Sequence, residues 1–200
     1  LSHLGVAREL GIITKQNVSK TKYKLNEGSD KIDDVLSIKI DDSDACPRYV
    51  ARIVKGLKVG PSPQWLIDRI ESIGLKSINN VVDSANYVLM NTGHPMHTFD
   101  LDKIVGDTIN IRYAKKGEEF ITLDGVKRKL DKFHLLICDE KKPIALAGIM
   151  GGLNSEITDS TADVLIESAY FNPTVIRKGA KKIDLSTEAS RRFERDTDME

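Results

Sequence analysis

"ADVLIESAYF", residues 162–171, is an apolar run of strand length that contains one carboxylate, Glu167. Polar residues precede the run and Asn-Pro follows it, which favours a β-strand. A carboxylate in a β core has to be paired, hydrogen-bonded or functional, because burying an isolated charge is costly. A half-exposed strand position is the alternative that the pattern leaves open. The run therefore predicts a strand and marks Glu167 as a candidate functional residue.

Other short β-like runs accompany this strand. They cover residues 35–40, 49–57, 108–114, 118–123, 126–130, 135–140 and 143–149. Asp124–Gly125 is a strong hairpin signal between two of them. Helical patterns occupy residues 1–10, 62–74 and 78–93, and two more are expected after Pro173. This mixture predicts an α+β fold, with a β-sandwich or mixed-sheet core flanked by helices.

Helix ends are signalled by residue type. Ser2 is expected to cap the first helix, which has an apolar side, and a polar loop follows up to about residue 31. Ser62 is predicted to cap the second helix, with Pro63 at its first position and Gly74 at its exit. The third helix is expected to end near Gly93.

Bulk properties limit the classes of protein to consider. The 200 residues suit one large or two small domains, and 30 basic against 30 acidic residues give no net charge. A chain built mainly to coat nucleic acid or anionic lipid is therefore disfavoured. No signal peptide or membrane-length apolar run is visible. The two cysteines lie outside any CxxC pattern, and this suggests that they are free thiols in a reducing cytoplasm. A start at Leu1 and an end at Glu200 within a helical pattern suggest a piece of a longer protein.

"GHPMHTFD", residues 93–100, places two histidines three residues apart. A metal site, a hydrolytic centre and a tight turn all have to be weighed. Zinc needs three or four ligands, and Pro95 prevents His94 and His97 from sharing a helical face. His3 and His134 are distant and lack ligand-like neighbours. No metal is therefore expected, and a turn or a hydrolytic role remains.

Two further motifs carry weaker signals. Cys138 lies inside an apolar run, where a buried and inert thiol is expected, and no GxSxG motif is present. "AGIMGG", residues 147–152, matches neither a P-loop nor GxGxxG. A tight turn and a backbone that passes close to a ligand both fit this segment.

The C-terminal region is locally basic. Residues 174–195 contain seven Lys or Arg against three Asp or Glu, an excess of four. Pro173 is expected to open one helix, and Ser186 or Thr187 to cap the next, with Glu188 in its first turn. A solvated helical face and a modest footprint for RNA are both compatible with these charges.

Taken together, these stretches resemble the β subunits of bacterial phenylalanyl-tRNA synthetases. The matching segments keep the family's order and spacing over nearly the whole chain. They are residues 1–10, 45–66, 78–104, 123–125, 145–152, 164–173 and 186–198. The resemblance implies that residues 1–40 are the tail of a preceding domain plus a linker. Residues 41–200 would then form the B3/B4 editing domain.

The resemblance also implies an activity. In this family the B3/B4 domain hydrolyses tyrosine wrongly attached to tRNA(Phe). Glu167 matches the glutamate that recognises the tyrosine hydroxyl, and His97 matches the editing histidine, as general base or as a group that holds water or ester. Gly151, Thr187 and Ala189 match further pocket positions.

Cofactors and partners follow from the same resemblance. No cofactor is implied for this domain, whereas the family's holoenzyme is an ATP- and Mg-dependent ligase. The implied partners are the 3′ end of tRNA(Phe) carrying tyrosine and the α subunit of a cytoplasmic α2β2 tetramer, with no membrane. His94 stands where many members carry Gln and is expected at a turn or rim. A non-catalytic domain that supports structure or contacts tRNA is the alternative.

Overall fold

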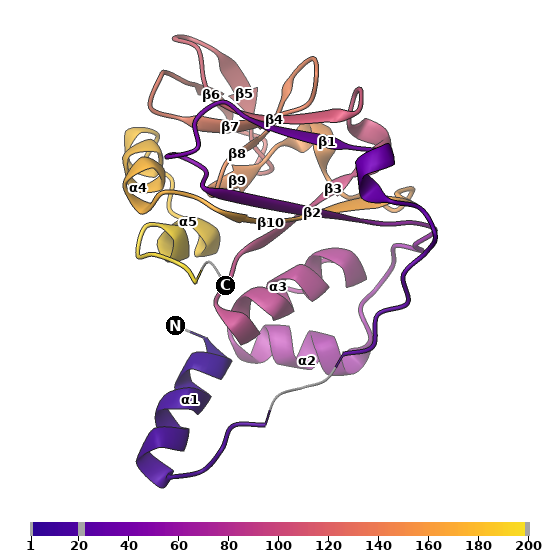
Figure 1. Cartoon of the computed structure of the whole chain (residues 1–200), viewed down its shortest axis with the longest axis vertical. Coiled ribbons are helices and arrows are strands. Elements are labelled where there is room, and N and C mark those ends of the chain that lie inside the picture. The colour runs from indigo at the N-terminus through magenta and orange to yellow at the C-terminus, as the bar shows by residue number, and fades with distance from the viewer. Residues whose placement is uncertain (1, 20–22, 199–200) are drawn as a thin grey trace.

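The structure is a computed structural model that describes residues 2–19 and 23–198. At its centre lies an antiparallel three-stranded sheet in the order β2–β10–β3. The strands are β2 (Arg48–Val54), β10 (Val164–Tyr170) and β3 (Met96–Asp100). The run that contains Glu167 thus forms the central strand, paired on both edges (Figure 1). Segments far apart in the sequence meet in this sheet.

A second, five-stranded sheet has the order β1–β4–β7–β8–β9. Its strands are β1 (Ser37–Ile40), β4 (Thr108–Tyr113), β7 (Leu135–Cys138), β8 (Pro143–Leu146) and β9 (Met150–Gly151). β1 pairs with β4 in parallel and the other pairs are antiparallel, so the sheet is mixed. A separate hairpin joins β5 (Glu119–Ile121) to β6 (Lys127–Lys129), and Gly125 takes a positive φ of 76° in its turn, as the Asp-Gly signal predicted.

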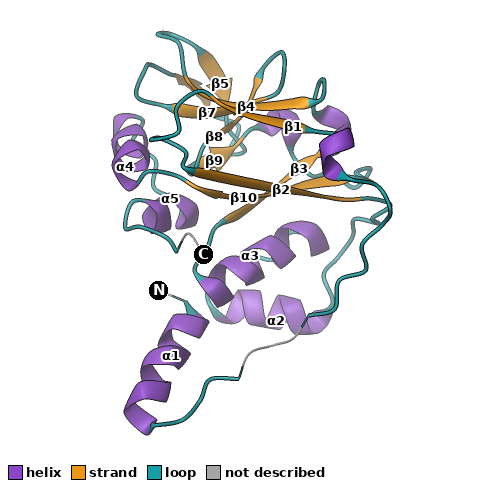
Figure 2. Cartoon of the chain, viewed as in Figure 1, coloured by secondary structure: helices purple, strands orange, loops and turns teal. Residues whose placement is uncertain are grey.

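The two larger sheets share one hydrophobic core. Ile111 of β4 and Leu136 of β7 belong to the same cluster of buried side chains as Leu165 of β10 and Phe99 of β3. All four have essentially no exposed surface. The alternation along β10 sends Leu165, Glu167 and Ala169 to the buried face. Figure 2 shows the two sheets as layers one above the other, with helices around them.

Helices flank this β core and confirm the predicted α+β class. They are α1 (His3–Thr14), α2 (Gln64–Ser72), α3 (Asn80–Thr92), α4 (Pro173–Lys182) and α5 (Glu188–Phe193). α2 and α3 pack together beside the three-stranded sheet, whereas α4 and α5 lie side by side near β9 and β10 (Figure 1). No helix in the described ranges has both the length and the apolar character that a membrane crossing requires.

Most of the predicted helix boundaries are confirmed. Ser2 accepts a hydrogen bond from the amide of Gly5, and Gly93 ends α3 in the left-handed conformation. Pro173 opens α4, and Thr187, rather than Ser186, caps α5. The first helix runs four residues past its predicted end, and the expectations for Leu1, for part of the polar loop and for the last two residues lie outside the described ranges.

The predicted cap of α2 is wrong. Pro63 stands at the N-cap, so it precedes the first helical residue, and no side chain caps the helix. The Ser62 hydroxyl instead donates to Asp83 on α3, at 2.6 Å. Asp83 is fully buried and also accepts from the Ser77 hydroxyl at 2.5 Å and from the Ile78 amide at 2.9 Å. A buried carboxylate needs these donors, and it offers Ser62 a stronger bond than a helix end does.

Replacing Asp83 by Ala is expected to destabilise the chain by about 3 kcal/mol. The substitution leaves the buried hydroxyl of Ser62 and the partly buried donors of Ser77 and Ile78 without this acceptor. Urea unfolding measures this loss. Asp68→Ala on the exposed side of α2 is the matched control and should change stability by less than about 0.5 kcal/mol. Equal effects of the two substitutions would contradict a structural role for Asp83.

Candidate functional site

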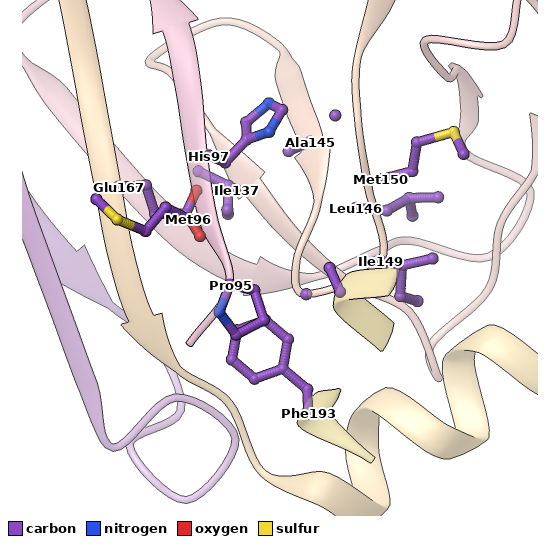
Figure 3. Close-up of a pocket in the computed structure, with 13 residues that line it drawn as sticks. Pro95, Met96, His97, Ile137, Ala145, Leu146, Ile149, Met150, Glu167 and Phe193 are labelled. Carbon is purple, nitrogen blue, oxygen red and sulfur yellow. The ribbon is translucent and has the colours of Figure 1, made fainter. Parts of the chain in front are cut away.

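A small cavity of about 50 Å³ lies where the two sheets meet. Its walls come from β3, β7, β8, β9, β10 and α5 (Figure 3). Apolar and backbone groups make up most of the lining, and Glu167 and His97 supply its ionisable side chains. The full lining is Pro95, Met96, His97, Ile137, Ala145, Leu146, Gly148, Ile149, Met150, Gly151, Glu167, Ala189 and Phe193. An apolar pocket with a few polar groups is the usual form of a small-molecule site.

Glu167 and His97 are direct neighbours across the sheet. Residue 167 of β10 is the register partner of residue 97 of β3. Residues opposite each other in an antiparallel pair share a face and have Cβ atoms about 5 Å apart. Pairing thus brings together two residues that lie far apart in the sequence. Residues 93–95 form the turn after α3, whereas His97 belongs to strand β3, so the strand and not the turn presents its side chain.

The Glu167 side chain is held in a nearly dry environment. The residue is 5% exposed, and its Oε2 atom has no hydrogen-bond partner among the residues that the structure describes. Burial raises the pKa of this carboxyl to about 8, which leaves it mostly protonated at neutral pH. The nearby Tyr49 hydroxyl lowers the pKa of Glu167 by less than burial raises it. Glu167 therefore has hydrogen-bonding capacity to offer a polar group that enters the pocket.

Tyr49 is a neighbour of the site that sequence reasoning missed. It lies on β2, two residues from Ala51, which is the register partner of Glu167. Tyr49 itself pairs with Ala169. Its buried hydroxyl makes no hydrogen bond of regular geometry with any residue in the described part of the chain. It is nevertheless close enough to Glu167 for each group to shift the pKa of the other. Strand alternation from residue 49 could have placed Tyr49 on the buried face, but nothing in the sequence paired β2 with β10.

His97 is neutral at physiological pH. Burial of the imidazole lowers its pKa to about 4, although part of the residue still meets solvent. Its ring packs edge-to-face on Phe99, with 4.6 Å between ring centroids. A neutral imidazole can donate one hydrogen bond and accept another. It is a weak base when its pKa is this low.

Gly151 brings backbone against the imidazole. A Cβ atom at residue 151 would collide with Nε2 of His97 and would lie 3.1 Å from Cδ1 of Leu123. Only glycine leaves room for the ring in this position. The tight turn expected of the Gly-rich segment is confirmed, since Gly148 has a φ of 65°. The backbone of Gly151 approaches the His97 ring, and its approach to a ligand stays a prediction.

Of the two predicted site residues at the start of α5, only one lines the pocket. Ala189 lines it, as does Phe193 at the end of the helix. Thr187 does not line it, since its hydroxyl caps α5 and donates to the carbonyl of Ile149 at 2.8 Å. Thr187 thus ties α5 to the segment that forms one pocket wall. Its predicted contact with substrate stays a prediction, as do the roles of the other four residues.

The remaining candidates lie apart from this chemistry. His94 is half-buried in the turn beside Phe193, next to pocket residue Pro95. Burial raises the pKa of Cys138 to about 11 and that of Cys46 to about 12, so both thiols are protonated at neutral pH. Within residues 2–19 and 23–198, no group of three or more His, Cys, Asp or Glu side chains is placed to hold a metal ion.

The raised pKa of Glu167 predicts how stability depends on pH. The unfolded carboxyl ionises near pH 4.5 and the folded one near 8, so stability should fall as pH rises through this interval. The lowered pKa of His97 makes stability rise with pH instead, but this gain is nearly complete above the unfolded pKa of 6.5. Between pH 6.5 and 8 the wild type should therefore lose about 1.5 kcal/mol relative to Glu167→Gln in urea unfolding. Parallel pH profiles of the two proteins would show that Glu167 is ionised in the fold.

The fold and the pocket define an α+β domain with a small, mainly apolar cavity that contains two ionisable side chains. The chain belongs to the B3/4 domain family, whose model matches residues 45–200. This match confirms the resemblance to that family.

Relatives extend the likeness over the whole chain. The chain is 47% identical to the phenylalanine–tRNA ligase beta subunit of Syntrophotalea carbinolica and 48% identical to that of Geobacter metallireducens, and all of its length is aligned in both. It spans about a quarter (25%) of the length of each of these relatives. A crystal structure of an N-terminal fragment of the phenylalanyl-tRNA synthetase β-subunit from Pyrococcus horikoshii shares the fold, with a TM-score of 0.52 at 17% identity, over 88% of this chain and 56% of that one.

Proposed function

We propose that this domain hydrolyses the ester that joins tyrosine to tRNA(Phe), as the editing domain of a phenylalanine–tRNA ligase β subunit. The observation that carries the proposal is the buried Glu167 side chain, whose Oε2 atom lacks a partner beside a cavity. Tyrosine is phenylalanine with one added hydroxyl, and an apolar synthesis pocket rejects such an addition by only ~10²-fold. A pocket built to bind the hydroxyl can discriminate by ~10⁴–10⁵.

Glu167 is suited to bind this hydroxyl. In either protonation state the carboxyl has an oxygen that accepts from the phenol O–H. Phenylalanine would leave that oxygen desolvated and unpaired. A benzene-sized ligand occupies a cavity of ~150 Å³ in an apolar protein core, so the ring requires the pocket to widen. Met96 and Met150 line it, and their flexible side chains can adapt.

The ester end of the substrate would lie beside Gly151 and His97. A water molecule attacks the carbonyl carbon, the bond to the ribose oxygen breaks, and tyrosine and tRNA with a free hydroxyl are released. The low pKa of His97 favours a role in holding the water or the ester over a role as general base. An aminoacyl ester is reactive, so positioning the water can supply much of the rate.

The proposal also fixes the partners of the domain. The substrate is the 3′ end of tRNA(Phe) carrying tyrosine, in the cytoplasm. Side chains and water carry out the hydrolysis without a cofactor. ATP and magnesium serve the synthesis reaction, which we assign to the α subunit of an α2β2 holoenzyme.

Deacylation of tyrosyl-tRNA(Phe) and phenylalanyl-tRNA(Phe) by the full-length protein that contains this chain tests the function. Selective release of tyrosine is expected. If neither ester is hydrolysed faster than in buffer, the domain is instead a structural or tRNA-contacting part of the same subunit.

A further inference from the structure

The cations of the basic C-terminal region fall into two groups. Arg191 and Arg192 of α5 pair with Glu188, at 3.4 and 2.7 Å, and Arg195, just beyond the helix, pairs with Glu194 at 3.2 Å. The four cations of α4 make no ion pair or side-chain hydrogen bond with any described residue. These are Arg177, Lys178, Lys181 and Lys182. The α5 segment keeps only one excess positive charge, since its three cations face two carboxylates, so most of the excess charge of the region lies on α4.

The α4 cations form one continuous exposed face. They occupy helix positions i, i+1, i+4 and i+5 and are all exposed, whereas Ile176, Gly179 and Ala180 on the opposite side are buried. Positions four apart on a helix are neighbours, about 6 Å from one another. Four like charges held this close repel each other unless an anion lies over them.

An aromatic ring extends this face. Phe133, 39% exposed, lies close to two ammonium groups: Lys182 Nζ is 5.2 Å and Lys132 Nζ 5.6 Å from the ring centroid. The neighbouring carboxylates, Asp131 and Asp184, reduce the local charge without cancelling it, since five cations minus two anions leave three positive charges. Proteins commonly bind single-stranded nucleic acid with cations that contact the phosphates and an exposed aromatic ring that stacks on a base.

This cationic face lies one helix away from the pocket. A Cβ atom at Gly179 would lie 3.4 Å from the side chain of Ile149, which lines the cavity, and 3.4 Å from the carbonyl of Phe133. The buried side of α4 therefore packs directly behind the pocket wall, and a helix with its side chains is only ~10–12 Å across. The phosphates next to a 3′-terminal ester could reach that far.

We propose that the exposed face of α4, together with Phe133, binds the phosphate backbone and a base of the RNA whose 3′ ester enters the pocket; this inference rests on the proposed function. The chain as a whole has no net charge that would attract RNA. The α4 face therefore supplies a local attraction next to the pocket, where the 3′ end of the RNA has to be oriented.

The test compares two double charge reversals in the full-length protein. Lys178→Glu/Lys181→Glu alters the α4 face. Lys116→Glu/Lys141→Glu alters two lysines that are equally exposed and have no ion pair with described residues, on loops of the five-stranded sheet. Both variants change the charge by the same amount. The readouts are the kcat and KM for deacylation of tyrosyl-tRNA(Phe), and hydrolysis of tyrosine methyl ester, which carries no RNA.

We expect the KM for tyrosyl-tRNA to be about 10-fold higher or more in the α4 variant. A plot of log kcat/KM against log salt concentration should be less steep than for the wild type, by about 1 to 2 in slope. Its hydrolysis of the methyl ester should equal that of the control and the wild type. Deacylation by the α4 variant at the level of the control would overturn the proposal.

Failure of the proposed function would give a different pattern. If the wild type hydrolyses neither ester, editing is absent. The cationic face of α4 is then tested by the binding of an acceptor-stem RNA that has a single-stranded 3′ end and carries no amino acid. Weaker binding by the α4 variant alone supports an RNA-binding face, and equal binding by both variants overturns it.

Discussion

Glu167→Ala is expected to remove the preference for tyrosyl-tRNA over phenylalanyl-tRNA. The variant loses the oxygen that accepts the phenol O–H, so kcat/KM for tyrosyl-tRNA should fall by about 10²–10³-fold. The value for phenylalanyl-tRNA should change little, because phenylalanine makes no such bond. The measurement is single-substrate deacylation with both aminoacyl-tRNAs.

Two controls make this result specific. Glu167→Gln keeps the shape of the side chain and an oxygen acceptor, so it should retain part of the selectivity. Glu119→Ala changes an exposed carboxylate on β5 and should behave as the wild type. Full selectivity in Glu167→Ala would exclude Glu167 from hydroxyl recognition, provided that circular dichroism shows an intact fold.

Gly151→Ala is expected to reduce hydrolysis of both esters by about 10²-fold or more. The new methyl group would occupy the place of the His97 imidazole, so the ring must move, and small displacements of positioned groups carry costs of this size. Overpacking should also destabilise the chain by about 1–3 kcal/mol. The loss should fall on kcat without changing the choice between tyrosine and phenylalanine, unlike the loss in Glu167→Ala.

Gly60→Ala is the matched control for this substitution. A Cβ atom at residue 60 would meet no atom within 4 Å, and its backbone is not in the left-handed region. Wild-type rates in Gly151→Ala would mean that the position of the His97 ring has no part in hydrolysis.

The sequence predicted local structure better than it predicted contacts between segments. Caps such as Ser2, Gly93 and Pro173 act within a few residues, so their effects can be read from the residue types around them. Ser62 failed as a cap because a carboxylate 21 positions later competes for its hydroxyl. Such long-range competition leaves no local signal.

The same limit applies to the candidate site. Glu167 stood out because a carboxylate in an apolar run is unusual, and His97 and the Gly-rich segment stood out as motifs. The family resemblance gave His97 and Gly151 their expected roles and added Thr187 and Ala189 as pocket positions. That Glu167 and His97 face each other depends on the register of β3 against β10, which no periodicity reveals. Tyr49 was missed for the same reason, and the lowered pKa of His97 arises from burial by strands distant in sequence.

The position of β10 between β2 and β3 also governs when this domain can form during translation. β2 and β3 end at residues 54 and 100, but the strand that joins them ends only at Tyr170. At 5–20 residues per second, a ribosome needs roughly 6 to 25 seconds to pass from the start of β2 to the end of β10. β2 exposes unpaired backbone edges for nearly all of that time, and β3, which ends at Asp100, for roughly 4 to 14 seconds. The emerging chain is therefore most open to misassociation, and to chaperones, before its central strand arrives.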